Sequence, residues 1–299
     1  MKVKILLSTV AVLTILGIAY YLIFTMEEQL VTSEQLISGY QYKKLERVDL
    51  RLEKIEERLF SFTYQSYDGS LVRGQIGYPD ISAEKYPVLI GVSAMGRGYF
   101  RWWTDSYKGR PTVTRVNEIA KLANQKGNVV IAIDARYHGT RKDPNRTLRS
   151  IMNDLTIWGD KTTYEEMIMN TVLDHRVLLD WIEQQDDLDS STIGVVGYSM
   201  GGQISLLLSA IDQRITKVAS IVPPFIDDRM AMVAPKNVTS MLANKTSVLM
   251  LSSDDDENSS EDENDFLFNS INNSNKKHIQ FEGSHILPEG YETSLQEWL

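Results

Sequence analysis

Short, mainly hydrophobic runs recur through the middle and C-terminal parts of the chain. They lie at residues 88–92, 128–134, 192–197, 217–222 and 247–252, and a more polar predicted strand at 277–282, "KHIQFE", completes the series. Such runs are rich in β-branched residues and mostly lack polar alternation, which is typical of strands buried on both faces of a sheet. The intervals show helical spacing of hydrophobic residues, at 114–127, 165–185 and 202–211. Strands that alternate with helices predict an α/β fold with a mostly parallel, doubly wound sheet.

The segment that precedes these runs has a different pattern, in which hydrophobic and polar residues alternate. Val48, Leu50 and Leu52 alternate with charged residues, and the sequence "YDGS" at 67–70 separates two alternating stretches. Alternation with a period of two is typical of strands with one buried face, and Asp-Gly is a frequent hairpin turn. We therefore expect the domain to begin with antiparallel strands.

The N-terminal residues 5–25 contain no charged residue. As a helix they would be roughly 31 Å long, enough to cross the hydrocarbon core of a membrane. Lys2 and Lys4 precede this segment and Glu27 and Glu28 follow it. Because positive charge stays on the cytoplasmic side, the bulk of the chain is predicted to lie outside the cell. A cleaved signal peptide is the alternative, but its hydrophobic region is normally about 7–15 residues long.

These features predict three parts of the chain. Residues 1–26 form a signal anchor, residues 27–45 a polar stalk, and residues 46–299 one catalytic domain. The length of the last part suits a single large α/β domain. The expected location is the cell membrane, with the domain extracytoplasmic, and secretion after cleavage is the alternative.

The acidity of the chain is concentrated in one place. The formal net charge is −9, and eight carboxylates without any Lys or Arg lie between Asp254 and Asp265, which leaves the rest of the chain near −1. No dense cluster of basic residues is present, so nucleic acid is not an expected partner. The chain has no cysteine, which excludes disulfides, thiolate metal sites and a cysteine nucleophile.

The sequence "GVVGYSMGG" at 194–202 contains the pattern Gly-x-Ser-x-Gly, with Ser199 between Gly197 and Gly201. It follows a predicted buried strand and precedes a predicted helix, which is the context of a nucleophile elbow. The glycines allow a sharp turn, and the turn presents the serine at a helix N-terminus. There the backbone N–H of Met200 is placed to stabilise an oxyanion.

A serine nucleophile needs a base, and the chain has four histidines. His175 lies within a predicted helix, His278 lies within the last predicted strand, and His138 follows an earlier strand. His285 lies in the loop directly after the last strand, at the edge where catalytic groups gather in open α/β sheets. The sequence therefore favours His285 as the base.

The base in turn needs an orienting carboxylate. The strand at 247–252 is followed by three consecutive candidates, Asp254, Asp255 and Asp256. A calcium loop is an alternative reading, because acidic or polar residues recur at every second position from Asp254 to Asp262. The Gly and the terminal Glu of such a loop are absent, however. No metal or other cofactor is expected.

These motifs together resemble the α/β-hydrolase superfamily. "GYSMGG" resembles its elbow, "GSHILP" its histidine loop, and "VVIAIDARYHGTR" a strand with a trailing Asp-x-Arg-x-x-Gly. "YDGSLVRGQIGYP" is similar to the first strands of the dienelactone hydrolase, acetyl xylan esterase and prolyl oligopeptidase branch. In the family the acid lies between the serine and the histidine along the chain. The family pattern, laid on "SSDDDEN", implies Asp256 as that acid.

The resemblance has one departure. The family usually carries His-Gly after its third strand, and this chain has Ser93-Ala94 there. By position, the backbone N–H of Met95 is the implied second oxyanion donor. A backbone donor does not depend on its own side chain, so the oxyanion hole is expected to survive the change.

The resemblance implies a serine hydrolase with the triad Ser199, Asp256 and His285, and with Met95 and Met200 as oxyanion donors. The leading expectation is hydrolysis of a small carboxylic ester through an acyl-enzyme. A peptidase or amidase of the same fold is one alternative. A catalytically silent surface interaction protein is the other. The expected partners are the ester substrate and, through the N-terminal helix, a membrane; the oligomeric state stays open.

Overall fold

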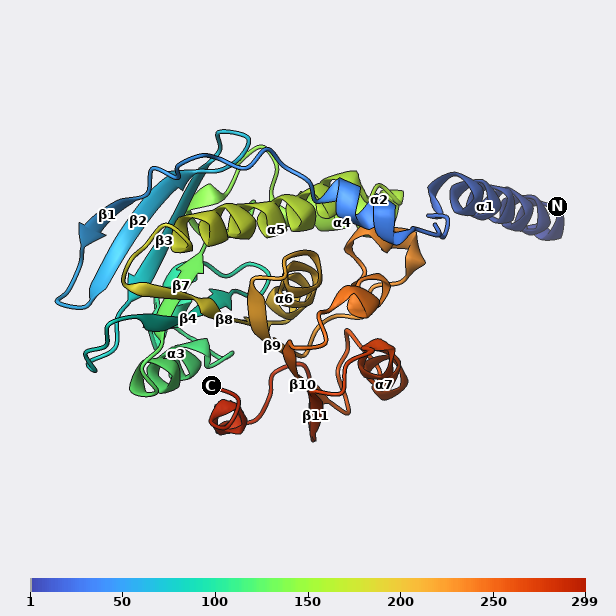
Figure 1. Ribbon diagram of the computed structural model, residues 1–299. Helices are drawn as coiled ribbons and strands as arrows, with labels where there is room; N and C mark the ends of the chain where they lie inside the picture. The colour runs from blue at the N-terminus through green and yellow to red at the C-terminus, as the bar shows by residue number, and fades with distance from the viewer. Residues whose placement is uncertain (1) are drawn as a thin grey trace.

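One large mixed sheet forms the centre of the molecule (Figure 1). The computed structural model describes the backbone of residues 2–299 and the side chains of residues 9–21 and 23–299. Within this part, the strand order is β1-β2-β3-β7-β4-β8-β9-β10-β11. The strands are β1 (Arg51–Lys54), β2 (Leu59–Gln65), β3 (Leu71–Gly77), β4 (Tyr86–Val92), β7 (Val129–Ile133), β8 (Leu188–Tyr198), β9 (Ile215–Ile221), β10 (Ser247–Ser253) and β11 (Lys276–Phe281). A short hairpin of β5 (Ser106–Tyr107) and β6 (Arg110–Pro111) lies apart from the sheet.

The two halves of the sheet differ as the hydrophobic pattern predicts. Strands β1, β2 and β3 pair antiparallel, and β3 pairs antiparallel with β7. From β7 through β11 every neighbouring pair is parallel. All five residues of β7 are buried, because helices cover both faces of the parallel part. The mostly parallel sheet with antiparallel N-terminal strands is therefore confirmed.

Helices lie on both faces of the sheet (Figure 1), and a hydrophobic cluster packs between the sheet and the helices on each face. On one side lie α4 (Leu148–Trp158), α5 (Thr162–Ile182) and α6 (Met200–Ile211), whose buried side chains include Ile168 and Ile204. On the other side lies α3 (Val116–Gln125), together with the C-terminal 3₁₀ turn Tyr291–Leu295. Other 3₁₀ turns cover Tyr99–Trp102, Gly139–Arg141, Asp228–Val233, Pro235–Asn237 and Thr239–Met241.

Helix α7 (Glu261–Ser270) includes part of the acidic segment 254–265. The sequence predicts a helix that begins near residue 264 and an acidic surface loop before it. In the structure α7 begins at Glu261, so half of the acidic run lies in its first turns. Ser260 caps the helix, and Glu263 completes the capping box. Acidic residues at a helix N-terminus are favourable because they offset the positive end of the helix dipole.

The N-terminal helix α1 (Lys2–Phe24) forms where the sequence predicts a transmembrane segment. Yet among the described residues no helix combines the length and the hydrophobicity that crossing a membrane requires. The transmembrane helix expected over residues 5–25 is therefore not supported. The extracytoplasmic location, which depended on it, stays a prediction.

The predicted stalk, residues 27–45, is folded onto the domain. It contains α2 (Ser33–Gly39), and Leu36 and Tyr40 are buried in the main hydrophobic cluster. The hydroxyl of Tyr40 donates to the carbonyl of Met232. A polar and charged composition suggested an exposed stalk, but these few hydrophobic side chains are enough to bring the segment against the core.

Candidate active site

The C-terminal ends of the parallel strands lie along one edge of the sheet, and the candidate residues follow them. Ligands bind at this edge in open α/β sheets. Tyr137, Ser199 and Val222 lie just past the ends of β7, β8 and β9, and all three have a positive φ. For residues other than glycine this conformation is strained, and such strain clusters at functional sites.

Ser199 lies at the predicted sharp turn between β8 and α6. Its φ of 57° and ψ of −122° place it outside the usual regions, as the residue before the first helical position. A Cβ on Gly197 would lie 2.0 Å from the carbonyl oxygen of Gly201, and one on Gly201 would lie 2.2 Å from that of Val92. Only glycine fits at either position, so the turn has the geometry of a nucleophile elbow.

The structure brings Ser199, His285 and Asp256 into one line of contacts. His285 Nε2 lies 2.8 Å from Ser199 Oγ, and His285 Nδ1 lies 2.9 Å from each carboxylate oxygen of Asp256. A proton on Nδ1, held by the carboxylate, leaves Nε2 free to accept the serine proton. Asp256 is buried, whereas Ser199 and His285 are partly exposed. The line of contacts thus has a buried carboxylate at one end and a partly exposed serine hydroxyl at the other.

The three consecutive aspartates have different surroundings. The Asp256 carboxylate accepts a hydrogen bond from the backbone N–H of Asn258 at 2.8 Å, which fixes its orientation. The Asp254 carboxylate accepts from the backbone N–H of Gly283. Asp255 is exposed, and its own N–H donates to the Gly283 carbonyl. Of the three, Asp256 contacts the imidazole of His285.

The other three histidines make contacts elsewhere. His175 Nδ1 contacts the carbonyl of Thr171 within α5, and His278 Nε2 contacts Ser252 Oγ. His138 is fully buried with its Nδ1 at 2.7 Å from the carbonyl of Arg136, and burial lowers its pKa to about 4. The assignment of His285 on its position after the last strand therefore agrees with the geometry.

The loop after β4 carries the expected oxyanion donor Met95. Ala94 accepts a hydrogen bond from the N–H of Arg97, and Gly96 has a φ of 77°, so Met95 lies at the corner of a tight turn. Met200, the other expected donor, is the first residue of α6, where backbone N–H groups lack helical partners. A Cβ on Gly201 would touch Val92 and Ser93, so the two loops lie close together.

Ser93, which stands where the family usually has histidine, has a structural contact. Its hydroxyl accepts a hydrogen bond from Trp102 Nε1 at 3.2 Å, and both residues are buried. Trp102 also packs against Gly91, where a Cβ would lie 2.5 Å from the indole ring. Trp102 thus belongs to the core.

Asp134, the first residue of the Asp-x-Arg-x-x-Gly motif, connects the loop after β4 to the loop after β7. It is fully buried and accepts hydrogen bonds from the backbone N–H groups of Tyr99 and Thr140. Burial raises the pKa of its carboxyl, against these hydrogen bonds. A Cβ on Gly139 would collide with the carboxylate, which explains the glycine of the motif. The motif is visible in the sequence, but the contact between Asp134 and the backbone of Tyr99 could not be predicted from it.

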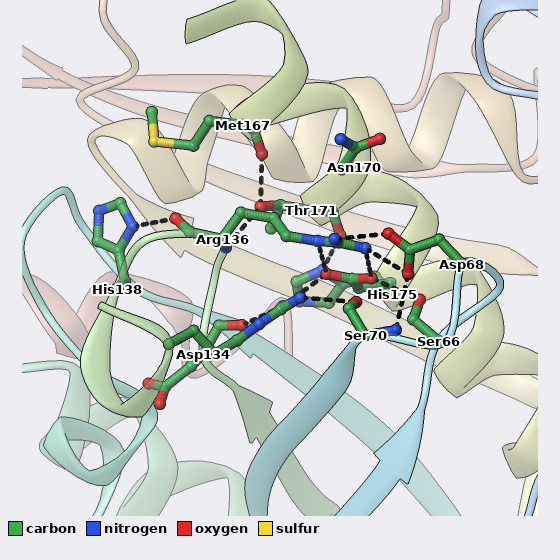
Figure 2. A network of polar contacts seen from close by, with 12 residues as sticks. Ser66, Asp68, Ser70, Asp134, Arg136, His138, Met167, Asn170, Thr171 and His175 are labelled. Atoms are coloured by element: carbon green, nitrogen blue, oxygen red, sulfur yellow. Dashed lines mark hydrogen bonds and ion pairs between the residues drawn. The ribbon is translucent and has the colours of Figure 1, made fainter. Parts of the chain in front are cut away.

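Arg136 of the same motif ties the loop after β7 to α5 and to the turn before β3 (Figure 2). Its guanidinium contacts Asp68 at 2.8 Å and the fully buried Asp174 at 2.7 Å, and its backbone N–H donates to Thr171. Arg141 also contacts Asp174. This network holds the loop that follows β7 in one position.

A cavity of about 510 Å³ lies beside that loop. It is lined by Tyr137, Lys142, Asp143, Pro144, Arg146, Thr147, Leu148 and Arg149. These residues precede or begin α4. Its size is within the range of small-molecule sites.

The residues of the calcium alternative are used in other ways. Asp256 contacts His285, Ser260 caps α7, and Asp262 lies within that helix. In the part of the chain that the structure describes, no group of three or more acidic or histidine side chains is placed to hold a metal ion.

Comparisons with known proteins agree with this architecture. The model of the alpha/beta hydrolase fold family matches residues 111–298. Acetyl xylan esterase 1 from Thermoanaerobacterium sp. JW/SL YS485 has a similar structure, with a TM-score of 0.69 and 17% identity over 92% of this chain and 94% of that one. The acetyl xylan esterase from Paenibacillus sp. R4 gives 0.64 and 16%, over 92% and 96%.

A putative dienelactone hydrolase from Klebsiella pneumoniae subsp. pneumoniae MGH 78578 gives a TM-score of 0.60 at 14% identity, over 80% of this chain and 96% of that one. No protein of curated function matches the chain by sequence. At these identities the structural likeness shows the fold. The family model, however, covers more than half of the chain, and the chain therefore belongs to the alpha/beta hydrolase fold family.

Proposed function

We propose that this protein is a serine hydrolase that cleaves carboxylic esters through an acyl-enzyme. The observation that carries the proposal is the line of contacts from Ser199 Oγ through the His285 ring to Asp256. A serine hydroxyl is a weak nucleophile, and a base within hydrogen-bond distance is what activates it. Two similar structures are acetyl xylan esterases, which favours an ester over an amide as the substrate.

In the first half of the reaction Ser199 Oγ attacks the carbonyl carbon of the ester while its proton passes to His285 Nε2. Asp256 stabilises the resulting imidazolium. The negative charge on the carbonyl oxygen is stabilised by the N–H groups of Met95 and Met200. The bond to the alcohol oxygen then breaks, and Nε2 returns the proton to the departing alcohol, which leaves the acyl group on Ser199.

In the second half a water molecule replaces the alcohol. His285 Nε2 accepts a proton from this water as its oxygen attacks the acyl carbon. The bond to Ser199 Oγ breaks, Nε2 returns the proton to the serine, and the carboxylic acid leaves. No cofactor takes part in this sequence, since every proton moves between the water, the histidine and the serine.

The first prediction tests the nucleophile in the full chain. We expect Ser199→Ala to lower the hydrolysis of p-nitrophenyl acetate by at least about 10³-fold, because the nucleophile is lost while the oxyanion donors remain. A fluorophosphonate should label wild type on Ser199 and leave the variant unlabelled, as read by mass spectrometry of the peptide. Ser240→Ala, which changes an exposed serine, should match wild type in both measurements.

Three outcomes separate the proposal from its alternatives. Wild-type hydrolysis that survives Ser199→Ala would place the reaction elsewhere and refute the proposal. Faster turnover of p-nitroanilides than of matched esters would indicate a peptidase or amidase. A wild-type protein that neither hydrolyses esters nor reacts with the fluorophosphonate would favour the silent interaction protein.

A further inference from the structure

The residue directly before the nucleophile has contacts that no motif assigns to it. Tyr198 is the last residue of β8 and is 1% exposed. Its hydroxyl donates to the backbone carbonyl of His285 at 2.8 Å and accepts from the backbone N–H of Leu287 at 2.9 Å. One phenol oxygen thus joins the strand that carries Ser199 to the loop that carries His285.

The ring of Tyr198 is itself fixed by aromatic neighbours. It lies edge-to-face against Tyr291, with centroids 6.0 Å apart, and the His285 ring approaches it at the same distance. Tyr291 is buried and donates its hydroxyl to the carbonyl of Thr114. Burial raises the pKa of Tyr198 to about 12, so the phenol stays protonated and remains a donor at ordinary pH.

The opposite side of the same loop is held by the acidic segment. The Asp254 carboxylate accepts from the N–H of Gly283, and the Asp255 N–H donates to the Gly283 carbonyl. The Glu257 carboxylate lies 3.4 Å from the N–H of His285, at the long end of a hydrogen bond. These contacts hold the loop from Gly283 to the N–H of His285, whereas Tyr198 holds it from the carbonyl of His285 to the N–H of Leu287.

We propose that Tyr198 is a positioning residue that sets the distance between His285 and Ser199. This inference rests on the proposed function, because it gives the tyrosine a role in the same proton transfer. The two hydrogen bonds lie at the backbone of His285 and two residues later, so without them this part of the loop loses its hydrogen bonds to the last residue of β8. Displacing a catalytic group by about 1 Å can slow a reaction by about 10²-fold.

The test is Tyr198→Phe in the full chain, which keeps the ring and removes only the hydroxyl. We expect the kcat for p-nitrophenyl acetate to fall about 10- to 100-fold with little change in KM, since the ester is still bound but the base is misplaced. Labelling by a fluorophosphonate should slow by a similar factor. Hydrogen exchange at the Leu287 amide should become faster, because its acceptor is gone.

Tyr64→Phe is the matched control. Tyr64 is 2% exposed, and its hydroxyl donates to the backbone carbonyl of Asp174 at 2.7 Å, on the helix side of the sheet. We expect this variant to lower the melting temperature but to keep the kcat and the Leu287 exchange rate of wild type. A loss of kcat that merely follows stability would appear in both variants and would overturn the inference.

The remaining outcomes are also decisive. A folded Tyr198→Phe protein with the kcat, labelling rate and Leu287 exchange of wild type would refute the positioning role. If wild type neither hydrolyses the ester nor reacts with the fluorophosphonate, the proposed function fails. Exchange at the His285 and Leu287 amides then decides the inference alone, with faster exchange in Tyr198→Phe supporting it and unchanged exchange overturning it.

Discussion

The three consecutive aspartates after β10 show how neighbouring residues of one type take different roles. Asp254 binds the backbone of the histidine loop, Asp255 is exposed, and Asp256 alone reaches the imidazole. Asp254 and Asp255 lie in a turn directly after β10, where successive side chains point in different directions. A contact with His285, 29 positions away, therefore selects one of the three.

A second prediction follows from this difference. We expect Asp256→Asn to lower kcat about 10³- to 10⁴-fold, because an amide neither stabilises the imidazolium nor holds the ring in the required tautomer. Asp255→Asn should retain the wild-type kcat. The measurement is steady-state hydrolysis of p-nitrophenyl acetate, with circular dichroism to verify folding. Equal activity in the two variants would refute the assignment of Asp256.

At the scale of elements, α7 gives the acidic run a structural role. Glu261, Asp262 and Glu263 lie in its first turn, and Ser260 caps it with Glu263 as the reciprocal partner. The cap residue and the glutamate three positions later form a motif that is visible in the sequence. The sequence predicts a surface loop here, because a dense run of carboxylates is usually solvated.

A third prediction concerns this cap. We expect Ser260→Ala to lower the free energy of unfolding by about 1 kcal/mol, because the first turn of α7 loses a side-chain acceptor. The kcat should not change, since the cap is not part of the site. Urea unfolding provides the measurement, and Ser274→Ala, at an exposed position, is the control. A loss below about 0.3 kcal/mol would show that the cap contributes little.

At the scale of the whole molecule, buried polar groups connect elements that are distant in the sequence. Arg136 and Arg141 of the loop after β7 meet Asp174 of α5, and His138 and His175 are buried nearby without an acidic partner on the ring. Burial lowers the pKa of both histidines. The fold therefore holds both rings in the neutral form.

A fourth prediction is that acid destabilises the fold through these histidines. Between pH 6.5 and pH 4 the unfolded chain binds a proton at His138 that the folded protein excludes, so stability falls as pH falls. Across this pH range, the protonation of His138 in the unfolded chain lowers the free energy of unfolding by roughly 3 kcal/mol. Urea unfolding at several pH values should show a shallower dependence for His138→Asn than for wild type. Parallel curves would contradict the prediction.

The sequence by itself determined the order of strands and helices along the chain, the mixed sheet and the sharp glycine-flanked turn at Ser199, and it predicted His285 as the base. These features depend on local chemistry: hydrophobic periodicity, glycines at a sharp turn, and the position of a residue relative to a strand end. The alternation of hydrophobic and polar residues before β2 did not predict the bounds of β1, because Val48 is buried although it lies outside that strand.

Only the tertiary structure showed that Asp256, which the family pattern implied, contacts His285, how Tyr198 and Asp134 hold the loops after the strands, and that residues 27–45 pack onto the core. It also removed support for a transmembrane segment at 5–25. Each of these facts except the last depends on side chains that lie far apart in the sequence, such as Tyr198 and Leu287, which are 89 positions apart. A local sequence pattern does not predict such contacts, because they form only when the folded sheet brings its loops to one edge.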